Sequence, residues 1–213
     1  MDDEAQARAY AEADFSEPHE AFAELLRTRF EGSPANARVV DLGCGPCDVV
    51  VRLAALFPDW RVDAVDGAPA MVKLGEARVR EEGLAGRVRV LLGRFPDVDL
   101  EVAAYDVVVS NSLLHHLPDP AILWGAVTRL GAPGARVGVM DLHRPASPGD
   151  AQALLDLYGE GQPEVLRRDF LASLHAAYTP EEVRAQIDAA GLSGLEVEVV
   201  SDRHLLVHGR LAR

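Results

Sequence analysis

Short apolar runs rich in valine and leucine alternate along the chain with longer segments whose apolar residues recur at helical spacing. The short runs are Arg38–Leu42, Arg61–Asp66, Arg87–Leu92, Tyr105–Ser110 and Ala135–Asp141. The helical segments are Val49–Phe57, Pro69–Glu82 and Pro120–Leu130. A nearly continuous apolar run is typical of a strand buried on both faces of a parallel sheet. The alternation therefore predicts right-handed βαβ crossovers and a doubly wound α/β sheet with helices on both faces.

Two helical regions lie outside this alternating pattern. Residues 1–31 predict an N-terminal helical cap, with Ser16 as its candidate N-cap. Four apolar residues of this cap share one face: Phe22, Leu25, Leu26 and Phe30. We expect residues 32–213 to form one α/β domain that carries a helical lid insertion at about residues 146–178.

The last helix has clear start and stop signals. Thr179-Pro180-Glu181-Glu182 combines an N-cap threonine, a proline at the first helical position and a glutamate at the third, which is a capping box. The helix should end at Gly191, a candidate C′ glycine. Leu195–Val200 and Leu205–Gly209 then predict an antiparallel hairpin.

A glycine loop between the first strand and the next helix carries the most informative chemistry: Asp41-Leu42-Gly43-Cys44-Gly45-Pro46-Cys47-Asp48. Gly43 and Gly45 remove side chains where a ligand has to approach the backbone. Asp66 ends the second strand, where a carboxylate can accept the hydroxyls of a ribose. The loop and Asp66 together predict a nucleoside site.

Three interpretations of this loop compete. A nicotinamide dinucleotide site requires a third glycine at position 48, which is Asp48 here. Cys44-Gly45-Pro46-Cys47 matches the redox tetrapeptide of thioredoxins, but those proteins are about half this length and have tryptophan where Gly43 stands. The strand–loop–helix context with Asp66 favours the third interpretation, although the two cysteines can still be sensitive to oxidation.

In the third interpretation, Asp41–Gly45 resembles the first motif of class I (Rossmann-like) methyltransferases that use S-adenosylmethionine (SAM). The third glycine of that motif is replaced by Cys47. Four later segments resemble the second to fifth motifs: Val65–Met71, Gly93–Phe95, Tyr105–Pro118 and Arg129–Val137. The resemblance covers about residues 37–145 and is strongest to the ubiquinone/menaquinone-type branch, whose acceptors are small molecules.

This resemblance implies a sheet with strand order 3-2-1-4-5-7-6 and an antiparallel strand 7. It also implies SAM as cofactor and S-adenosylhomocysteine as product, with Asp66 on the ribose and Met71 on the adenine face. Arg94 stands where many relatives have an aspartate for the adenine amino group. The cofactor-binding residues that it implies are Asp41, Gly43, Gly45, Asp66, Gly67, Met71, Gly93, Arg94, Phe95 and Asn111.

Methyl transfer needs no metal, and a base assists it only when the acceptor must lose a proton. His115 and His116 follow the fourth strand at the ligand-binding edge, and we expect one of them, His116 in preference, to act as base or to orient the acceptor. A backbone-bonded loop histidine is the alternative. A zinc site that adds Asp141 and His143 is a further alternative, although the tight ligand spacing is missing.

Five residues are candidates for binding the acceptor: Tyr10, Phe15, His143, Arg144 and Arg168. Arg144 can clamp a carboxylate or phosphate, or form an ordinary surface ion pair. Arg168 can belong to a lid that holds the acceptor, or to a solvated charged face. Tyr10 and Phe15 lie in the segment that folds over the cofactor in the proteins that the chain resembles, but core packing explains them nearly as well.

Composition limits the partners. The net charge of −13 argues against nucleic acid as a main partner. No apolar run reaches the ~20 residues of a membrane span, and the acidic N-terminus is unlike a signal peptide. We therefore expect a cytoplasmic monomer or homodimer that methylates a small molecule. The alternative is a SAM-binding regulatory protein of the same fold without transfer activity.

Overall fold

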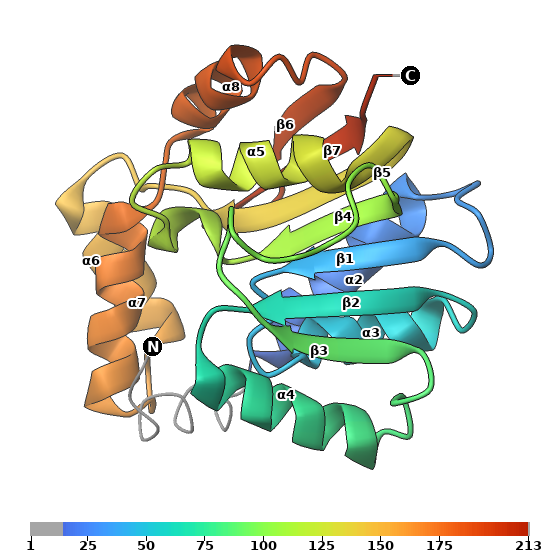
Figure 1. Ribbon diagram of the computed structural model, residues 1–213. Coiled ribbons are helices and arrows are strands. Elements are labelled where there is room, and N and C mark those ends of the chain that lie inside the picture. Colours follow the sequence, from blue (N-terminus) through green and yellow to red (C-terminus); the bar gives the residue numbers. More distant parts are fainter. Residues whose placement is uncertain (1–14, 213) are drawn as a thin grey trace.

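A computed structural model describes residues 15–212, which form a seven-stranded sheet between two layers of helices (Figure 1). The strands are β1 (Arg38–Leu42), β2 (Arg61–Asp66), β3 (Val88–Leu92), β4 (Tyr105–Asn111), β5 (Gly131–Leu142), β6 (Leu195–Val199) and β7 (His204–Arg210). Their order is β3-β2-β1-β4-β5-β7-β6, and β7 is antiparallel to β5 and β6. Both features confirm the prediction from the sequence.

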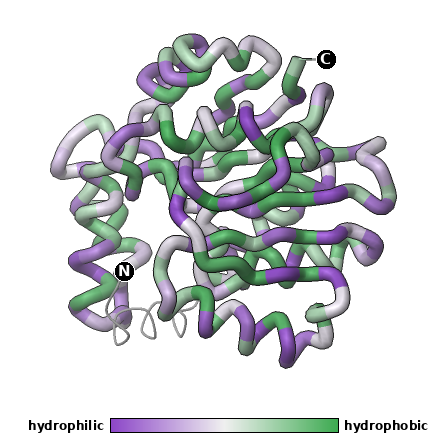
Figure 2. The backbone as a smooth tube through the Cα atoms, viewed as in Figure 1, coloured by the Kyte–Doolittle hydropathy of each residue, from purple (hydrophilic) through white to green (hydrophobic). Residues whose placement is uncertain are grey.

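Helices cover both faces of the sheet, as the apolar pattern predicts. On one face, α2 (Ser16–Arg29), α3 (Asp48–Leu56) and α4 (Pro69–Glu81) share a core with the side chains of the strands. On the other face, the core contains α5 (Ala121–Leu130) and α8 (Pro180–Ala189). Hydrophobic residues concentrate on the strands, whereas hydrophilic and hydrophobic residues alternate along α4 (Figure 2).

The connection from β3 to β4, residues 93–104, contains no helix. Phe95, Val98 and Leu100 from this segment pack instead against the core that contains α5. The sheet therefore keeps a covered face at this crossover although a helix is missing there.

Two helices stand at the carboxyl ends of the parallel strands. They are α6 (Pro148–Tyr158) and α7 (Glu164–Ala176), and they pack on each other beside the edge of the sheet (Figure 1). Both fall inside the predicted insertion. The short 3₁₀ helix η1 (Leu114–His116), which follows β4, contacts α7. The insertion thus covers the edge at which α/β sheets bind ligands.

The helix boundaries follow local signals with one exception. Thr179 and Glu182 form the predicted capping box, and Gly191 adopts a φ of +71° after α8. Ser16, however, is the first residue of α2 and not its N-cap, because the helix starts one residue earlier than the serine pattern predicts. The predicted apolar face of α2 packs closely on β5, where an added Cβ at Gly138 would clash with Leu26.

Candidate active site

The glycine loop leaves β1 and turns into α3 with backbone angles that suit glycine. Gly43 has a φ of +78°, and a Cβ there would lie 2.9 Å from Leu113. Gly45 has a φ of +52°, and a Cβ there would meet nothing within 4 Å, so this part of the loop opens on free space. Gly43 N–H donates to the Val65 carbonyl at 2.8 Å, which fixes the loop against the end of β2.

Asp66 ends β2 and holds the glycine loop through its carboxylate. One oxygen accepts the Gly45 N–H at 2.9 Å, and the other accepts the Ala68 N–H at 2.8 Å. A carboxylate oxygen has two lone pairs, so each retains capacity for a hydroxyl donor. Asp66 therefore has both a structural position in the loop and acceptor capacity for a ligand.

Asp41 is the carboxyl group beside the glycine loop that the protein leaves unsatisfied. The residue is 2% exposed, and its Oδ1 atom has no hydrogen-bond partner. Burial, together with the charge of Asp66, raises the pKa of Asp41 to about 7. A buried acceptor without a partner is costly, and such groups concentrate at binding sites. The position of Asp41 favours a ligand with a cationic donor.

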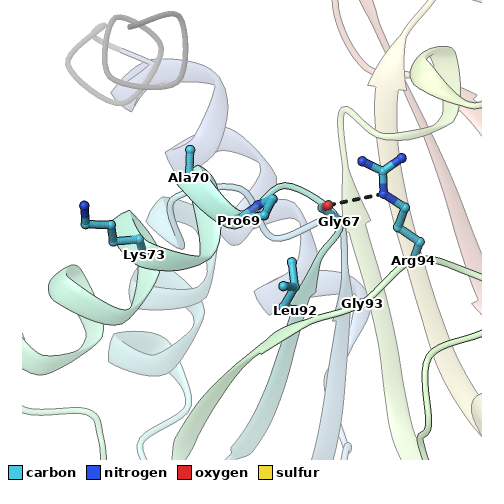
Figure 3. Close-up of a pocket in the computed structure, with 7 residues that line it drawn as sticks. All are labelled: Gly67, Pro69, Ala70, Lys73, Leu92, Gly93 and Arg94. Carbon is cyan, nitrogen blue, oxygen red and sulfur yellow. Dashed lines mark hydrogen bonds between the residues drawn. The ribbon is translucent and has the colours of Figure 1, made fainter. Parts of the chain in front are cut away.

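A cavity of about 620 Å³ lies beyond Asp66, between β3 and the start of α4 (Figure 3). Its walls include three predicted cofactor residues and four neighbours: Gly67, Gly93, Arg94, Pro69, Ala70, Lys73 and Leu92. Arg94 Nε donates to the Gly67 carbonyl at 3.3 Å, which places the guanidinium beside the turn after β2. A Cβ at Gly93 would lie 2.5 Å from Val98.

Met71 and Phe95 are close in sequence to these walls, but neither residue lines the cavity. Met71 is 2% exposed and packs with Ala68 inside α4, and Phe95 packs against the opposite core. The assignment of both residues to the cofactor stays a prediction, with Met71 buried in α4 and not on the cavity wall.

A second cavity, of about 650 Å³, lies between the carboxyl edge of the sheet, the start of α2 and the helices α6 and α7. Phe15, Met140 and Phe170 contribute apolar wall. Asn111, at the end of β4, also lines this cavity, and its Oδ1 atom is buried without a partner. A ligand in this cavity would thus meet apolar walls and an available amide acceptor.

His115 and His116 both line the second cavity, but in different environments. His115 Nδ1 lies 2.5 Å from Asp141 Oδ1, and the two side chains are only 4% and 2% exposed. His116 lies beside it, with ring centroids 4.0 Å apart. His116 is exposed, yet desolvation by the surrounding protein, with His115 close by, lowers its pKa to about 4.

Asp141 is held by two backbone donors in addition to His115. Its Oδ2 atom accepts the Leu114 N–H and its Oδ1 atom accepts the Leu142 N–H, both at 2.7 Å. The end of β5 therefore fixes both η1 and the His115 ring. The sequence indicated Asp141 only as a member of the zinc alternative. Within residues 15–212, no cluster of three or more histidine, cysteine, aspartate or glutamate side chains is arranged to hold a metal ion.

The predicted acceptor-binding residues separate in the structure. Phe15 lines the second cavity, and Tyr10 lies outside the described residues. Arg144 pairs with Glu182 of the α8 capping box, which is the surface ion pair that the sequence analysis gave as its alternative. His143 contacts the Ser201 carbonyl at 3.4 Å, and Arg168 is exposed beside Asp169. Neither His143 nor Arg168 is among the described residues that line the cavity.

Two arginines of the second cavity wall, Arg203 and Arg167, are not among the residues that the sequence analysis assigns to acceptor binding. The Arg203 side chain is 9% exposed, stacks 3.4 Å from the Tyr158 ring centroid and pairs with Asp202 at 2.9 Å. Arg167 donates to the Gly159 carbonyl at 2.6 Å. The adjacent arginines at 167 and 168 were a visible signal, but no local pattern shows which of the two faces the cavity.

Asp48 occupies the position where a nicotinamide site would have its third glycine. Its carboxylate accepts from His19 at 2.7 Å, Arg52 at 3.0 Å and Arg78 at 2.7 Å. Burial raises the pKa of Asp48, but the hydrogen bonds with His19 and Arg52 outweigh it and lower the pKa overall. Asp48 thus joins α2, α3 and α4 behind the loop, which explains why glycine is absent there.

Cys44 and Cys47 are free and buried in the glycine loop. The hydrogen bond with Cys47 and burial raise the pKa of the Cys44 thiol. A raised thiol pKa is the opposite of what an activated redox cysteine requires. The thioredoxin-like interpretation therefore has no support from this geometry.

Comparison with known proteins agrees with these features. Residues 39–134 match the family described as a methyltransferase domain. The matched segment is a little under half of the chain. The match begins within β1 and ends within β5, so it contains the glycine loop, Asp66 and both histidines.

Curated proteins that are similar to this chain differ in their acceptors. The chain is 34% identical over 125 residues to a ubiquinone biosynthesis O-methyltransferase of Xanthomonas axonopodis pv. citri, covering 57% of this chain and 48% of that protein. It is 36% identical over 104 residues to a trans-aconitate 2-methyltransferase of Mycobacterium sp., covering 47% and 37%. The chain thus spans about half or less of the length of these relatives.

The fold is shared with solved structures over nearly the whole chain. A SAM-dependent methyltransferase of Aquifex aeolicus superposes with a TM-score of 0.73 and 19% identity, covering 99% of both chains.

The part of the chain that the structure describes contains no helix long and apolar enough to cross a membrane.

Proposed function

We propose that the methyltransferase domain binds SAM and transfers its methyl group to a small-molecule acceptor, leaving S-adenosylhomocysteine. The observation that carries this proposal is the buried Asp41 Oδ1 atom, which has no hydrogen-bond partner. It lies beside the glycine loop, whose Gly45 N–H donates to Asp66. A ligand with an ammonium group and a ribose would satisfy both carboxylates, and SAM contains both groups.

The residues present fit SAM in three parts. Asp41 would accept from the ammonium of the methionine moiety, since its Oδ1 atom is buried without a partner. Asp66 would accept from the ribose hydroxyls with its remaining lone pairs. The cavity of about 620 Å³ beside Gly67 and Gly93 would hold the adenine. When bound, SAM supplies a methyl group activated by a sulfonium.

The second cavity is the proposed acceptor site. It begins at Asn111, at the end of β4, and extends under α6 and α7. Its volume of about 650 Å³ falls in the range of sites for small organic ligands. The protein's main contribution to transfer is to hold the acceptor nucleophile in line with the methyl group, at about 3–3.5 Å. A small molecule suits this cavity better than a nucleic acid does, given the net charge of −13.

Methyl transfer to a metabolite panel from SAM with a radiolabelled methyl group tests the proposal. We expect label in a small-molecule product, and Asp41→Asn should reduce its formation at subsaturating SAM. Arg144→Gln is the matched control, because Arg144 pairs with Glu182 away from both cavities. SAM binding without transfer to any acceptor would support a regulatory protein instead, and absence of SAM binding would overturn the proposal.

A further inference from the structure

His115 and Asp141 form a buried pair on the wall of the proposed acceptor cavity. They come from different elements, η1 and β5, and approach to 2.5 Å. Both side chains are more than nine-tenths buried, and His115 still lines the cavity. A histidine held by a carboxylate at a ligand site is an arrangement that can serve proton transfer.

The hydrogen bonds around Asp141 decide how the His115 ring is oriented. Two backbone N–H groups, from Leu114 and Leu142, already donate to this carboxylate. A carboxylate that collects donors requires an N–H from the ring as well, so Nδ1 is the donor nitrogen. The proton on Nδ1 leaves Nε2 as the nitrogen with a lone pair, which is the form that can accept a proton.

The chemistry of the acceptor determines whether such a base is useful. A carboxylate is already ionised and needs no base, and an amine attacks with its lone pair before it loses a proton. A phenol or enol is a weak nucleophile until its O–H proton leaves, so it gains most from a positioned base. The His115–Asp141 pair therefore favours a hydroxyl acceptor over a carboxylate.

The walls of the cavity agree with an uncharged acceptor. Phe15, Phe170 and Met140 give apolar surface. The two arginines among the described wall residues are both engaged, Arg167 with the Gly159 carbonyl and Arg203 with Asp202 and the Tyr158 ring. Arg203 also lies 3.4 Å from Glu17, and Arg167 lies 4.0 Å from Asp156, so acidic neighbours offset the positive charge of both arginines.

We propose that the acceptor is an uncharged phenol or enol with an apolar body, that His115 Nε2 removes its hydroxyl proton, and that Asp141 is the residue that positions His115. This rests on the proposed function. The acceptor O–H proton passes to Nε2, and the oxygen forms a bond to the methyl carbon of SAM. The carbon–sulfur bond breaks with its electron pair on sulfur, which gives a methyl ether and S-adenosylhomocysteine.

Several titratable or charged groups surround the pair and can shape its pH dependence. His116 adjoins the pair on η1, Asp169 of α7 lies near His116, and His204 of β7 lies near Asp141. Glu17 and His19 of α2 line the same cavity, as do Arg167 and Arg203. Desolvation lowers the pKa of both His116 and His204 to about 4, so both rings are neutral near pH 7 and add no charge beside His115.

Two variants distinguish a role of His115 in proton transfer from a purely structural role of its hydrogen bond with Asp141. His115→Gln keeps an N–H that can donate to Asp141, so the fold of η1 should persist, but it lacks the base. Asp141→Asn keeps an acceptor for a backbone N–H and removes the carboxylate that orients the ring. His175→Gln is the matched control, because His175 is an exposed histidine of α7 outside the described cavity wall.

The first measurement needs no turnover. The phenol 4-nitrophenol changes colour when it ionises, so its spectrum reports the proton at the site. With the wild-type protein and with His175→Gln, we expect bound probe to be enriched in phenolate compared with free probe at the same pH. His115→Gln and Asp141→Asn should lose this enrichment. Absence of enrichment in the wild type, or its persistence in His115→Gln, overturns the proposal.

The second measurement compares a phenol with the carboxylic acid of the same skeleton as acceptors from radiolabelled SAM. We expect the methyl ether to form and the ester not to form. His115→Gln should lower kcat by about 100-fold or more with unchanged SAM affinity, and a rise in pH that ionises the phenol in solution should restore part of the rate. Ester formation unaffected by His115→Gln overturns this proposal while the proposed function stands. Loss of SAM binding by the wild type would instead overturn the proposed function.

Discussion

The stability of Asp41→Asn relative to the wild type, measured in the absence of SAM, should increase as the pH rises. Asp41 is buried, its Oδ1 atom has no partner, and its pKa is raised from 3.8 to about 7, mainly by burial. The folded state therefore holds a proton that the unfolded state releases above about pH 4. Between about pH 4 and pH 7, Asp41 ionises in the unfolded state only, which lowers the free energy of unfolding progressively as the pH rises. Above about pH 7 the group is ionised in both states, and the loss is constant.

The magnitude follows from the two pKa values of Asp41. One pKa unit corresponds to about 1.4 kcal/mol, so the cost is about 4 kcal/mol at pH 8 and about 2 kcal/mol at pH 5. The asparagine of the variant would have no charge to lose, although its amide also has to be buried. That burial cost is the same at both pH values and cancels in the comparison. The stability of Asp41→Asn relative to wild type should therefore increase by about 2–3 kcal/mol between pH 5 and pH 8.

Urea unfolding of both proteins across this pH range, without SAM, measures the difference. Asp63→Asn is the matched control, because Asp63 is also buried but bonded to Arg89 and Tyr105. Burial raises the pKa of Asp63, but these hydrogen bonds outweigh it and keep the pKa below its usual value, so this carboxylate is charged throughout the range. Its variant should lose a similar amount of stability at every pH. A flat difference for Asp41→Asn would refute the reasoning, since it would mean that the Asp41 carboxylate has a partner in the folded protein.

Three further predictions concern the cofactor site. SAM affinity should rise between about pH 5 and pH 7 in titration calorimetry, because its ammonium favours ionised Asp41, and an equal slope in Asp41→Asn would exclude this cause. Asp66→Ala should weaken SAM binding by about 2–3 kcal/mol and also lower stability, since Asp66 accepts the Gly45 N–H; unchanged affinity would mean that Asp66 is misassigned. Thiol counting should find Cys44 and Cys47 reduced, and the double serine variant should keep substantial SAM binding; disulfide-reductase activity lost in that variant would revive the thioredoxin-like interpretation.

The fold could be predicted from the sequence because its signals are local. Each buried strand is a short apolar run, and the capping box at Thr179 fixes the start of α8 without reference to the rest of the chain. The glycine loop is also a local signal, because glycines, Gly43 and Gly45, stand at two of the positions where it adopts positive φ values. The strand order came from the resemblance to a known family, because no local pattern determines which strands pair.

The acceptor site could be predicted only in part, because its contacts join distant segments. His115 and His116 are adjacent in sequence, and we expected His116 to be the base. The structure instead places Asp141, 26 residues later, on His115. Arg144 was equally ambiguous, since its partner Glu182 lies 38 residues away and belongs to a cap. Local patterns indicate which residues can perform chemistry, but only tertiary contacts show which of them face one cavity.

The glycine loop and its two carboxylates, Asp41 and Asp66, are the proposed SAM site on which the activity of this domain depends. Calorimetric titration of the wild-type protein with SAM, S-adenosylhomocysteine and NAD tests that site most directly. We predict saturable binding of SAM and S-adenosylhomocysteine and none of NAD, because Asp48 occupies the position where NAD sites have glycine and ties three helices together. Tight binding of NAD without binding of SAM would contradict this assignment.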